Sequence, residues 1–448
     1  MNLLGEPGVG LPDIPGRPVK GPAGRLWDRP WRPWKIYVIL VIWLLGKVAL
    51  AVDDWYMSRD VFTGAQGPFP AGFAAEAPVA PEHVIRGPES GQALVHGLLL
   101  RWTDEYSDGY YGMAAVDART GKEYWHYERR DVDDALVWQF GASESTAVAR
   151  FTDGKLVALD LRTGRMLWHA EIEAGDRGRN VKVAGGQVVT EDPGAVRAFA
   201  ERDGRELWTA KTPQWCPEVF LRSVHALPDH LSAVHVLCNG SGRYGPDDIG
   251  LLLGIDNRTG KVLWRQRTVE PDLAVWGDGN LVVLQDPSHR QTVQVFAMNR
   301  EGIVPRAGLP REPVAVGGGT VLSGTNPKDR TGKHDTLLSA FDAVDGHLSW
   351  QLRAPGDHEY GIPKIADGRV YVVRQPYLTA AYAGSQFLAD LLVLDADTGR
   401  LLHTLRLPTM TAADEIADDD KLDIGEVSGG TVGIRWRGDS EDMLTVTD

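Results

Sequence analysis

The sequence has few cysteines, fewer basic than acidic residues and none of the common catalytic motifs. Only Cys216 and Cys238 occur among 448 residues, and they are neither adjacent nor spaced as zinc ligands. The net charge of −14 excludes bulk neutralisation of phosphates, so we predict no nucleic-acid partner. The motifs H-E-x-x-H and G-x-S-x-G and a phosphate-binding P-loop are absent. We therefore predict no catalytic and no metal-binding residues.

Long apolar runs are also scarce, and the one that occurs, from 36 to 52, predicts a single transmembrane helix. The Pro- and Gly-rich residues 1–35 lack apolar periodicity and predict a disordered tail. This tail has six basic and three acidic residues, whereas only Arg59 is basic shortly after the run. Because positive charge stays on the cytoplasmic side, we expect a single-pass protein of the cell membrane with a cytoplasmic N-terminus. A linker is expected over 53–82.

Two other interpretations of the run 36–52 stay open. The sequence Ala49-Leu50-Ala51 has the form that signal peptidase cleaves, so the run is alternatively a signal peptide removed after Ala51. The third interpretation is a buried core helix, although no amphipathic segment flanks the run. An anchor and a signal peptide both place the rest of the chain outside the cytoplasm, where oxidising conditions permit disulfides. The spacing of Cys216 and Cys238 suits neighbouring strands, so we predict a disulfide, with two buried free thiols as the alternative.

From about residue 83 to residue 448 the chain repeats one pattern of strand, turn and strand. A clear copy is Leu156-Val-Ala-Leu-Asp160-Leu-Arg-Thr163-Gly164-Arg-Met-Leu-Trp168. Apolar residues alternate into the turn, the Asp can accept hydrogen bonds from the N–H groups that follow, and the Gly supplies a positive φ. The turn and Trp residues of the recognisable copies are Asp117, Gly121, Trp125, Asp160, Gly164, Trp168, Gly204, Trp208, Asp256, Gly260, Trp264, Asp342, Gly346, Trp350, Asp395 and Gly399.

A second hairpin precedes most copies, as in Val316-Gly317-Gly318-Gly319-Thr-Val-Leu, so each unit has four antiparallel strands. The units recur at a spacing that is typical of β-propeller blades. The motif apolar-x-A-x-D-x-x-T-G-x-x-x-W resembles the PQQ-like, or quinoprotein-type, β-propeller repeat family, which includes BamB-like folds. This resemblance implies that each Trp packs between adjacent blades. The copy at 293–304 lacks the Trp and the turn Asp, and His403 replaces the last Trp, so less regular junctions are expected there.

The end of the chain bears on the number of blades. Residues 427–435 predict another upstream hairpin and 443–448 match a third strand, so the last blade lacks its outer strand. A segment near 83–86 would supply that strand and leave no open sheet edge. We therefore predict an all-β, eight-bladed propeller of four-stranded antiparallel blades over 83–448, with seven blades as the alternative.

The resemblance also raises the question of an enzyme. Quinoprotein dehydrogenases of this family imply a vicinal Cys pair over the cofactor PQQ, a metal held by Glu, Asn and Asp, and an Asp base. The vicinal pair is absent here, and the turn Asp residues recur in most copies, which indicates a structural role. We expect no cofactor, and a PQQ-dependent dehydrogenase-like enzyme is the alternative. His126, His169 and His403 lie at or just after the Trp position and are expected on strand surfaces.

Loops that depart from the repeat are candidates for a binding surface, since loops carry much of the function of rigid folds. They run from 325 to 336 and from 375 to 387, and ordinary connectors are the alternative. The acidic stretch 414–423 is expected to be a solvated connector, with weak Ca²⁺ binding as the alternative. These observations favour a non-catalytic scaffold that binds a protein or another cell-envelope component. An extracellular sensor for a separate signalling partner is the second alternative.

Overall fold

The computed structural model describes residues 41–43, 60–70, 93–105, 110–129, 137–172, 180–238, 249–268, 275–278, 281–284, 293–309, 313–325, 336–378, 382–412, 421–428, 431–437 and 443–446. The chain divides into two units, 1–57 and 58–448. In the first unit only Val41, Ile42 and Trp43 are described, and they are helical. Within the described ranges, no helix has the length and apolar character that crossing a bilayer requires. The predicted tail, and most of the predicted span and linker, lie outside those ranges.

The second unit is built of antiparallel β-sheets. Its described residues form eight sheets of three to five strands and one two-stranded ribbon. The first four sheets contain β1 (Val61–Thr63), β2 (Ala93–Val95), β3 (Leu98–Glu105), β4 (Tyr110–Asp117) and β5 (Glu123–Arg129); β6 (Val137–Ala142), β7 (Thr146–Phe151), β8 (Lys155–Asp160) and β9 (Met166–Glu171); β10 (Val181–Ala184), β11 (Gln187–Asp192), β12 (Ala195–Ala200) and β13 (Glu206–Lys211); and β14 (Val219–Leu227), β15 (Leu231–Cys238), β16 (Ile249–Asp256) and β17 (Val262–Thr268).

The other four sheets and the ribbon follow in chain order. They contain β18 (Val275–Asp278), β19 (Leu281–Leu284), β20 (Val293–Met298) and β21 (Ile303–Leu309); β22 (Ala315–Gly317), β23 (Thr320–Thr325), β24 (Leu337–Asp342) and β25 (Leu348–Arg353); β26 (His358–Tyr360), β27 (Lys364–Ala366), β28 (Arg369–Pro376), β30 (Asp390–Asp395) and β31 (Leu401–Arg406); the ribbon of β29 (Gln386–Phe387) and β32 (Met410–Thr411); and β33 (Lys421–Ser428), β34 (Thr431–Arg437) and β35 (Met443–Val446).

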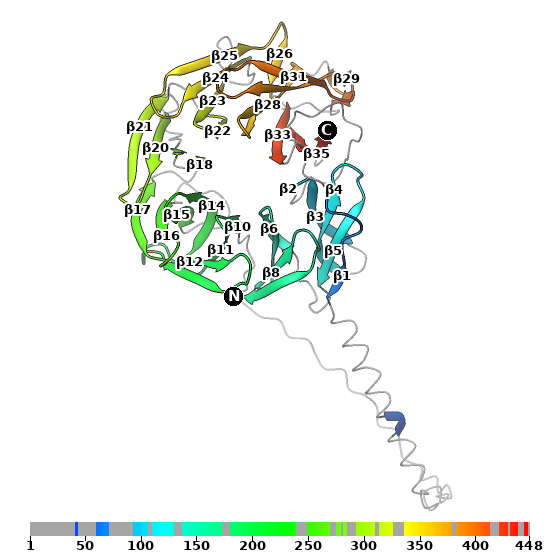
Figure 1. The fold of residues 1–448 in the computed structure, drawn as a ribbon, viewed down its shortest axis with the longest axis vertical. Helices are drawn as coiled ribbons and strands as arrows, with labels where there is room; N and C mark the ends of the chain where they lie inside the picture. The colour runs from blue at the N-terminus through cyan, green and yellow to red at the C-terminus, as the bar shows by residue number, and fades with distance from the viewer. Residues whose placement is uncertain are drawn as a thin grey trace, which may run out of the picture. The chain divides into compact units, whose positions relative to one another are not determined.

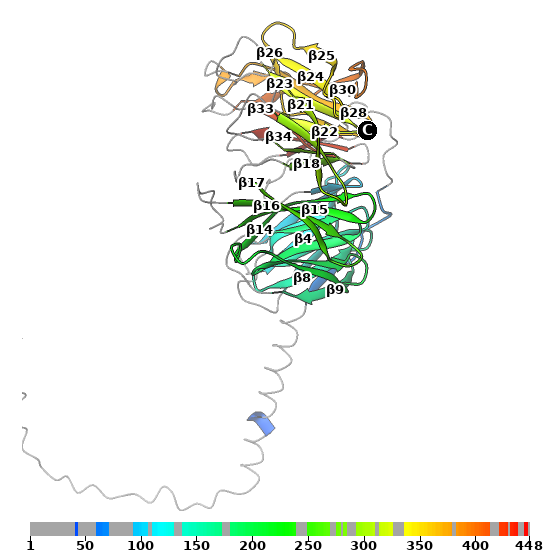
Figure 2. The ribbon, with the colours of Figure 1, turned by 90° about the vertical axis from the view of Figure 1, so that its left-hand side faces the viewer.

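The sheets stand around a central axis, with one inner strand each. The inner strands are β2, β6, β10, β14, β18, β22, β27 and β33, each of which contacts the next, and β33 contacts β2. Figures 1 and 2 show this arrangement from two directions. Because the series of contacts closes on itself, the inner strands surround a channel.

Each outer hairpin of the repeat is held by its turn residues. Oδ1 of Asp160 accepts hydrogen bonds from the N–H and the hydroxyl of Thr163, both at 2.8 Å. The N–H of Gly164 donates to the carbonyl of Asp160 at 2.8 Å, and Gly164 has φ +71°, which glycine adopts without strain. Equivalent carboxylate-to-N–H bonds are made by Asp117, Asp256, Asp342 and Asp395. The motif therefore builds its hairpin from local contacts.

A small residue faces each Trp of the repeat across the hairpin. The facing pairs are Ala115–Trp125, Ala158–Trp168, Ala198–Trp208, Gly254–Trp264 and Ala340–Trp350. Where His403 replaces the Trp, the facing residue is the larger Val393. The Ala of the motif is thus explained by the space that an indole ring occupies on the neighbouring strand.

The Trp and the turn Gly meet across sheet junctions. Trp125 is completely buried, and its Nε1–H donates to the carbonyl of Leu161 in the next sheet at 2.8 Å. Its ring also lies against Gly164, where an added Cβ would be only 2.7 Å from the indole. The same contact joins Trp168 to Gly204, Trp208 to Gly260 and Trp350 to Gly399. These contacts link consecutive sheets into one body.

The ring is closed by hydrogen bonds between the last sheet and the first. The N–H of Leu94 donates to Oε2 of Glu426 at 2.5 Å, and the N–H of His96 donates to Oγ of Ser428 at 3.1 Å. The sheet of β33 to β35 has three strands within the described residues, and the predicted donor near 83–86 lies outside them. A strand that the sequence did not predict, β1, pairs with β5 at the outer edge of the first sheet.

Candidate functional site

A cavity of about 570 Å³ lies where the inner strands of five sheets converge. Its lining comes from β2, β6, β10, β27 and β33, so residues far apart in the sequence share one space. The polar and charged side chains in this lining are those of Gln139, Lys182, Lys364, Glu426 and Ser428. We call this space the channel cavity.

Glu426 is the one carboxylate in the described lining of the channel cavity. Its side chain is tied to the first sheet by the hydrogen bond from Leu94 described above. Burial raises the pKa of Glu426, although the Leu94 N–H and the cations of Arg435, Lys364 and Lys182 partly oppose that shift. The cavity therefore favours the neutral form of this carboxyl relative to water.

Two lysines face the same space. Burial lowers the pKa of Lys182, and the charge of Arg222 lowers it further, while Glu426 and Glu191 oppose the shift. Burial likewise lowers the pKa of Lys364, with a contribution from Arg435. A lysine that is desolvated beside other cations gains from any anion that binds next to it.

None of the turn and Trp residues predicted from the sequence lines the channel cavity. They lie on the outer hairpins, where their contacts build the fold. The signal that could have revealed the lysines and Glu426 is positional. Lys182, Lys364 and Glu426 each lie three residues before the two-residue turn of an inner hairpin, in V-K-V-A-G-G, P-K-I-A-D-G and G-E-V-S-G-G. A charged residue that recurs at one position of a repeat points to a shared location.

Cys216 and Cys238 form a disulfide. Cys216 precedes β14, and Cys238 ends the neighbouring strand β15, where it is paired with Val219. Both are buried in a core cluster that includes Trp208. The disulfide thus closes the inner hairpin of the fourth sheet at its end away from the turn.

The predicted binding loops are only partly described. Most of 325–336 and of the acidic stretch 414–423 lies outside the described residues. In the loop 375–387, Phe387 is buried, and the centroid of its ring lies 5.6 Å from the centroid of the Trp436 ring. This aromatic residue therefore contributes to the core.

Three histidines were expected on strand surfaces. His169 and His403 are exposed, and His126 is half-buried.

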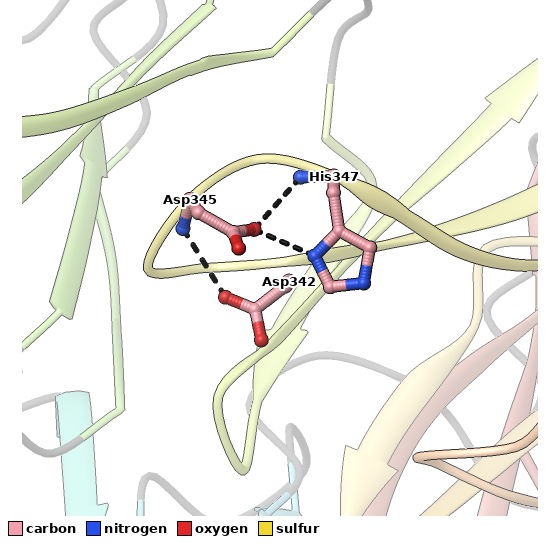
Figure 3. A group of neighbouring side chains, drawn as sticks. All are labelled: Asp342, Asp345 and His347. Atoms are coloured by element: carbon pink, nitrogen blue, oxygen red, sulfur yellow. Dashed lines mark hydrogen bonds and ion pairs between the residues drawn. The ribbon is translucent and has the colours of Figure 1, made fainter.

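One group of side chains in the described part of the chain is close enough to hold a metal ion, namely Asp342, Asp345 and His347 (Figure 3). Oδ1 of Asp342 accepts the N–H of Asp345 at 3.2 Å, and Oδ1 of Asp345 accepts the N–H of His347 at 3.0 Å. The N–H of His347 and its ring, whose Nδ1 lies 2.6 Å from the same oxygen, lower the pKa of Asp345. The group is the repeat turn of the sixth sheet, and its turn hydrogen bonds account for its geometry.

A buried histidine in β15 predicts a dependence of stability on pH. Burial, with the charges of Arg222 and His225, lowers the pKa of His235 from 6.5 to about 4. The unfolded chain therefore binds a proton that the folded chain rejects, so stability present above pH 6.5 is lost as the pH falls toward 4. We expect this histidine to contribute a loss of about 2 kcal/mol between pH 7 and pH 5.

The measurement is urea denaturation at both pH values. In His235→Gln the difference between the two pH values should shrink by that amount, whatever the substitution costs at pH 7. His169→Gln, at an exposed site, should keep the full difference. An unchanged difference in His235→Gln would contradict the prediction.

The sequence matches the family described as outer membrane protein assembly factor BamB over residues 88–193, 192–304 and 250–448. The chain belongs to the BamB family. This membership agrees with the antiparallel sheets and with the PQQ-like repeat, so the fold is a BamB-type β-propeller. A sequence comparison with curated proteins finds no match.

Solved structures of similar fold include a BamB protein and two proteins named as dehydrogenases. BamB from Moraxella catarrhalis is 14% identical with a TM-score of 0.48, over 82% of this chain and 99% of that one. A europium-containing methanol dehydrogenase is 12% identical with a TM-score of 0.40, over 80% and 83%. The dihydro-heme d1 dehydrogenase NirN is 14% identical with a TM-score of 0.42, over 72% and 67%.

Proposed function

We propose that this BamB-family protein is a non-catalytic scaffold of the cell envelope that binds a protein or another envelope component. Residues 36–52 anchor it in the membrane as a single pass, with the N-terminus in the cytoplasm and the propeller outside. Two observations support export of the propeller. Basic residues are concentrated before the apolar run, and the disulfide between Cys216 and Cys238 requires an oxidising compartment to persist.

Eight blades are part of this proposal, with each of the eight larger sheets as one blade. The closed series of contacts between inner strands supports this number, as does the Trp–Gly contact between consecutive sheets. A closed ring leaves only short, protected strand edges at the channel and holds its loops in fixed positions. A rigid disc of this kind suits a binding function.

The observation that carries the non-catalytic assignment is the set of charged groups at the channel cavity. A quinoprotein centre there would need a Ca²⁺ or similar ion, which takes about six to eight oxygen ligands. The described lining offers one carboxylate, Glu426, together with the ammonium groups of Lys182 and Lys364. Two cations beside the lone carboxylate oppose a divalent metal, so these residues do not fit a metal–PQQ centre.

The test is a titration of the purified full chain with PQQ and Ca²⁺, followed by calorimetry and by the absorbance of the quinone. We expect neither heat of binding nor a spectral change at micromolar PQQ that depends on Ca²⁺. Loss of residual binding in Lys182→Met would show that any weak signal is electrostatic. Micromolar, Ca²⁺-dependent binding of PQQ would refute the non-catalytic assignment and direct the work to a dehydrogenase substrate.

A further inference from the structure

Three charged side chains occupy one equivalent position in three inner hairpins. Lys182, Lys364 and Glu426 each lie two residues before the last paired residue of an inner strand, which is Ala184, Ala366 and Ser428 respectively. The inner strands surround one axis and their hairpins are repeats of one design. Equivalent positions therefore lie at a similar depth along the channel, and all three side chains line the channel cavity.

The two lysines come from opposite sides of the channel. In the closed series of inner strands, β10 with Lys182 and β27 with Lys364 are separated by four steps in either direction. A ligand on the axis would therefore meet one ammonium group from each side. The cavity volume of about 570 Å³ is in the range that small-molecule sites occupy.

The charge at this level of the channel is positive, although the protein has a net charge of −14. Lys182 and Lys364, with Arg222 and Arg435 close enough to lower their pKa values, outnumber the carboxylates that oppose this shift, Glu426 and Glu191. Among the described lysines, Lys421 is ion-paired with Glu359, whereas no ion pair is found for the two channel lysines. Cations that are desolvated and held in no ion pair gain from a bound anion, although Glu426 acts on both lysines and Glu191 on Lys182.

We propose that the channel cavity binds a small multivalent oxyanion, a di- or tricarboxylate or a phosphate compound, between Lys182 and Lys364. This inference rests on the proposed function, since it assigns a ligand to a binding protein. Gln139 and Ser428 in the same lining add neutral hydrogen-bond donors for further oxygens. Glu426 repels the anion, so its raised pKa makes anion binding stronger as the pH falls.

Calorimetry of the purified full chain at low ionic strength tests the proposal, with citrate and pyrophosphate as separate probes. At least one of them should bind, and added salt should weaken the binding. Lys182→Met and Lys364→Met keep most of the length of the side chain but remove its charge, and each should weaken binding about tenfold or more. Glu426→Gln keeps an acceptor for the Leu94 N–H and should tighten binding several-fold.

Lys211→Met provides the matched control, because Lys211 is an exposed lysine at the end of β13. This variant should bind the probes as the unmodified chain does, and thermal unfolding shows that each variant is folded. Citrate binding alone assigns carboxylates, and pyrophosphate binding alone assigns phosphates. The proposal is overturned if neither probe binds, or if both channel variants bind as tightly as Lys211→Met.

The result is separable from the test of the proposed function. If the chain binds neither citrate nor pyrophosphate and does not bind PQQ, the proposed channel ligand is refuted and the proposed scaffold role stands. If the chain binds citrate through both lysines and also binds PQQ with Ca²⁺, the anion site is supported and the non-catalytic assignment is refuted.

Discussion

Replacing Trp125 with Ala is expected to lower the free energy of unfolding by about 3–5 kcal/mol. The indole is fully buried between the first and second sheets and donates a hydrogen bond to the carbonyl of Leu161. Its removal leaves a cavity against Gly164 and an unsatisfied carbonyl, since the close packing of the two sheets limits their collapse. Urea denaturation followed by circular dichroism measures the loss.

The same repeat supplies a control at another junction. Trp264 occupies the equivalent position and donates to the carbonyl of Asn299 at 2.8 Å, but it is only partly buried. In the next turn at that junction, Gly302 has φ +147°, and a Cβ added there would have no atom within 4 Å. Trp264→Ala should therefore cost about 1–2 kcal/mol. Equal losses in the two variants would contradict the proposed role of the Trp–Gly contact.

The glycine side of this contact can be tested in the same way. Gly164→Ala places a methyl group 2.7 Å from the Trp125 ring at a φ of +71°. Gly186→Ala has a similar φ of +75° and no atom within 4 Å, so it isolates the cost of the backbone conformation. Gly164→Ala should lose about 1–3 kcal/mol more than Gly186→Ala, because the ring must move.

Replacing both Cys216 and Cys238 with Ala is expected to destabilise the propeller by about 3 kcal/mol. The disulfide joins residues that are 22 apart in the sequence, and its loss frees that loop in the unfolded chain. The loss is measured as the shift of the urea midpoint. A reducing agent should lower the midpoint of the unmodified chain and leave that of the double variant unchanged.

The disulfide also reports on the compartment. If residues 36–52 direct export, a chain without them should accumulate with both cysteines reduced, since the cytoplasm keeps thiols reduced. Alkylation of denatured samples followed by a mass shift measures this. A fully oxidised pair in the deleted chain would argue against the export role of this segment.

The architecture could be predicted because the repeat acts through local contacts. Asp160 and Gly164 are four residues apart, and the hydrogen bonds of the turn are made within that span. Because the same residues recur in successive copies, the all-β class and the antiparallel four-strand unit followed from the sequence. The β1 strand was missed, since the segment Val61–Thr63 lies in a Gly- and Pro-rich linker and is only three residues long.

Only the tertiary structure showed which residues the repeat residues contact. The sequence indicated that Asp and Gly form a turn and that Trp is buried. It did not show that Trp125 rests on Gly164 of the following copy or that Ala115 is small because it faces Trp125. Contacts of this kind join positions that are distant along the chain, so no spacing within one copy reports them.

The sequence by itself determined the repeating unit, its turn chemistry and the expectation of export, because each depends on neighbouring residues or on composition. Only the tertiary structure brought Lys182, Lys364 and Glu426 into one cavity. Each of these residues looks like an ordinary polar residue of a short strand when its own hairpin is considered. They share one cavity because the ring closes. Closure places equivalent positions of distant copies around one axis and reduces their contact with water.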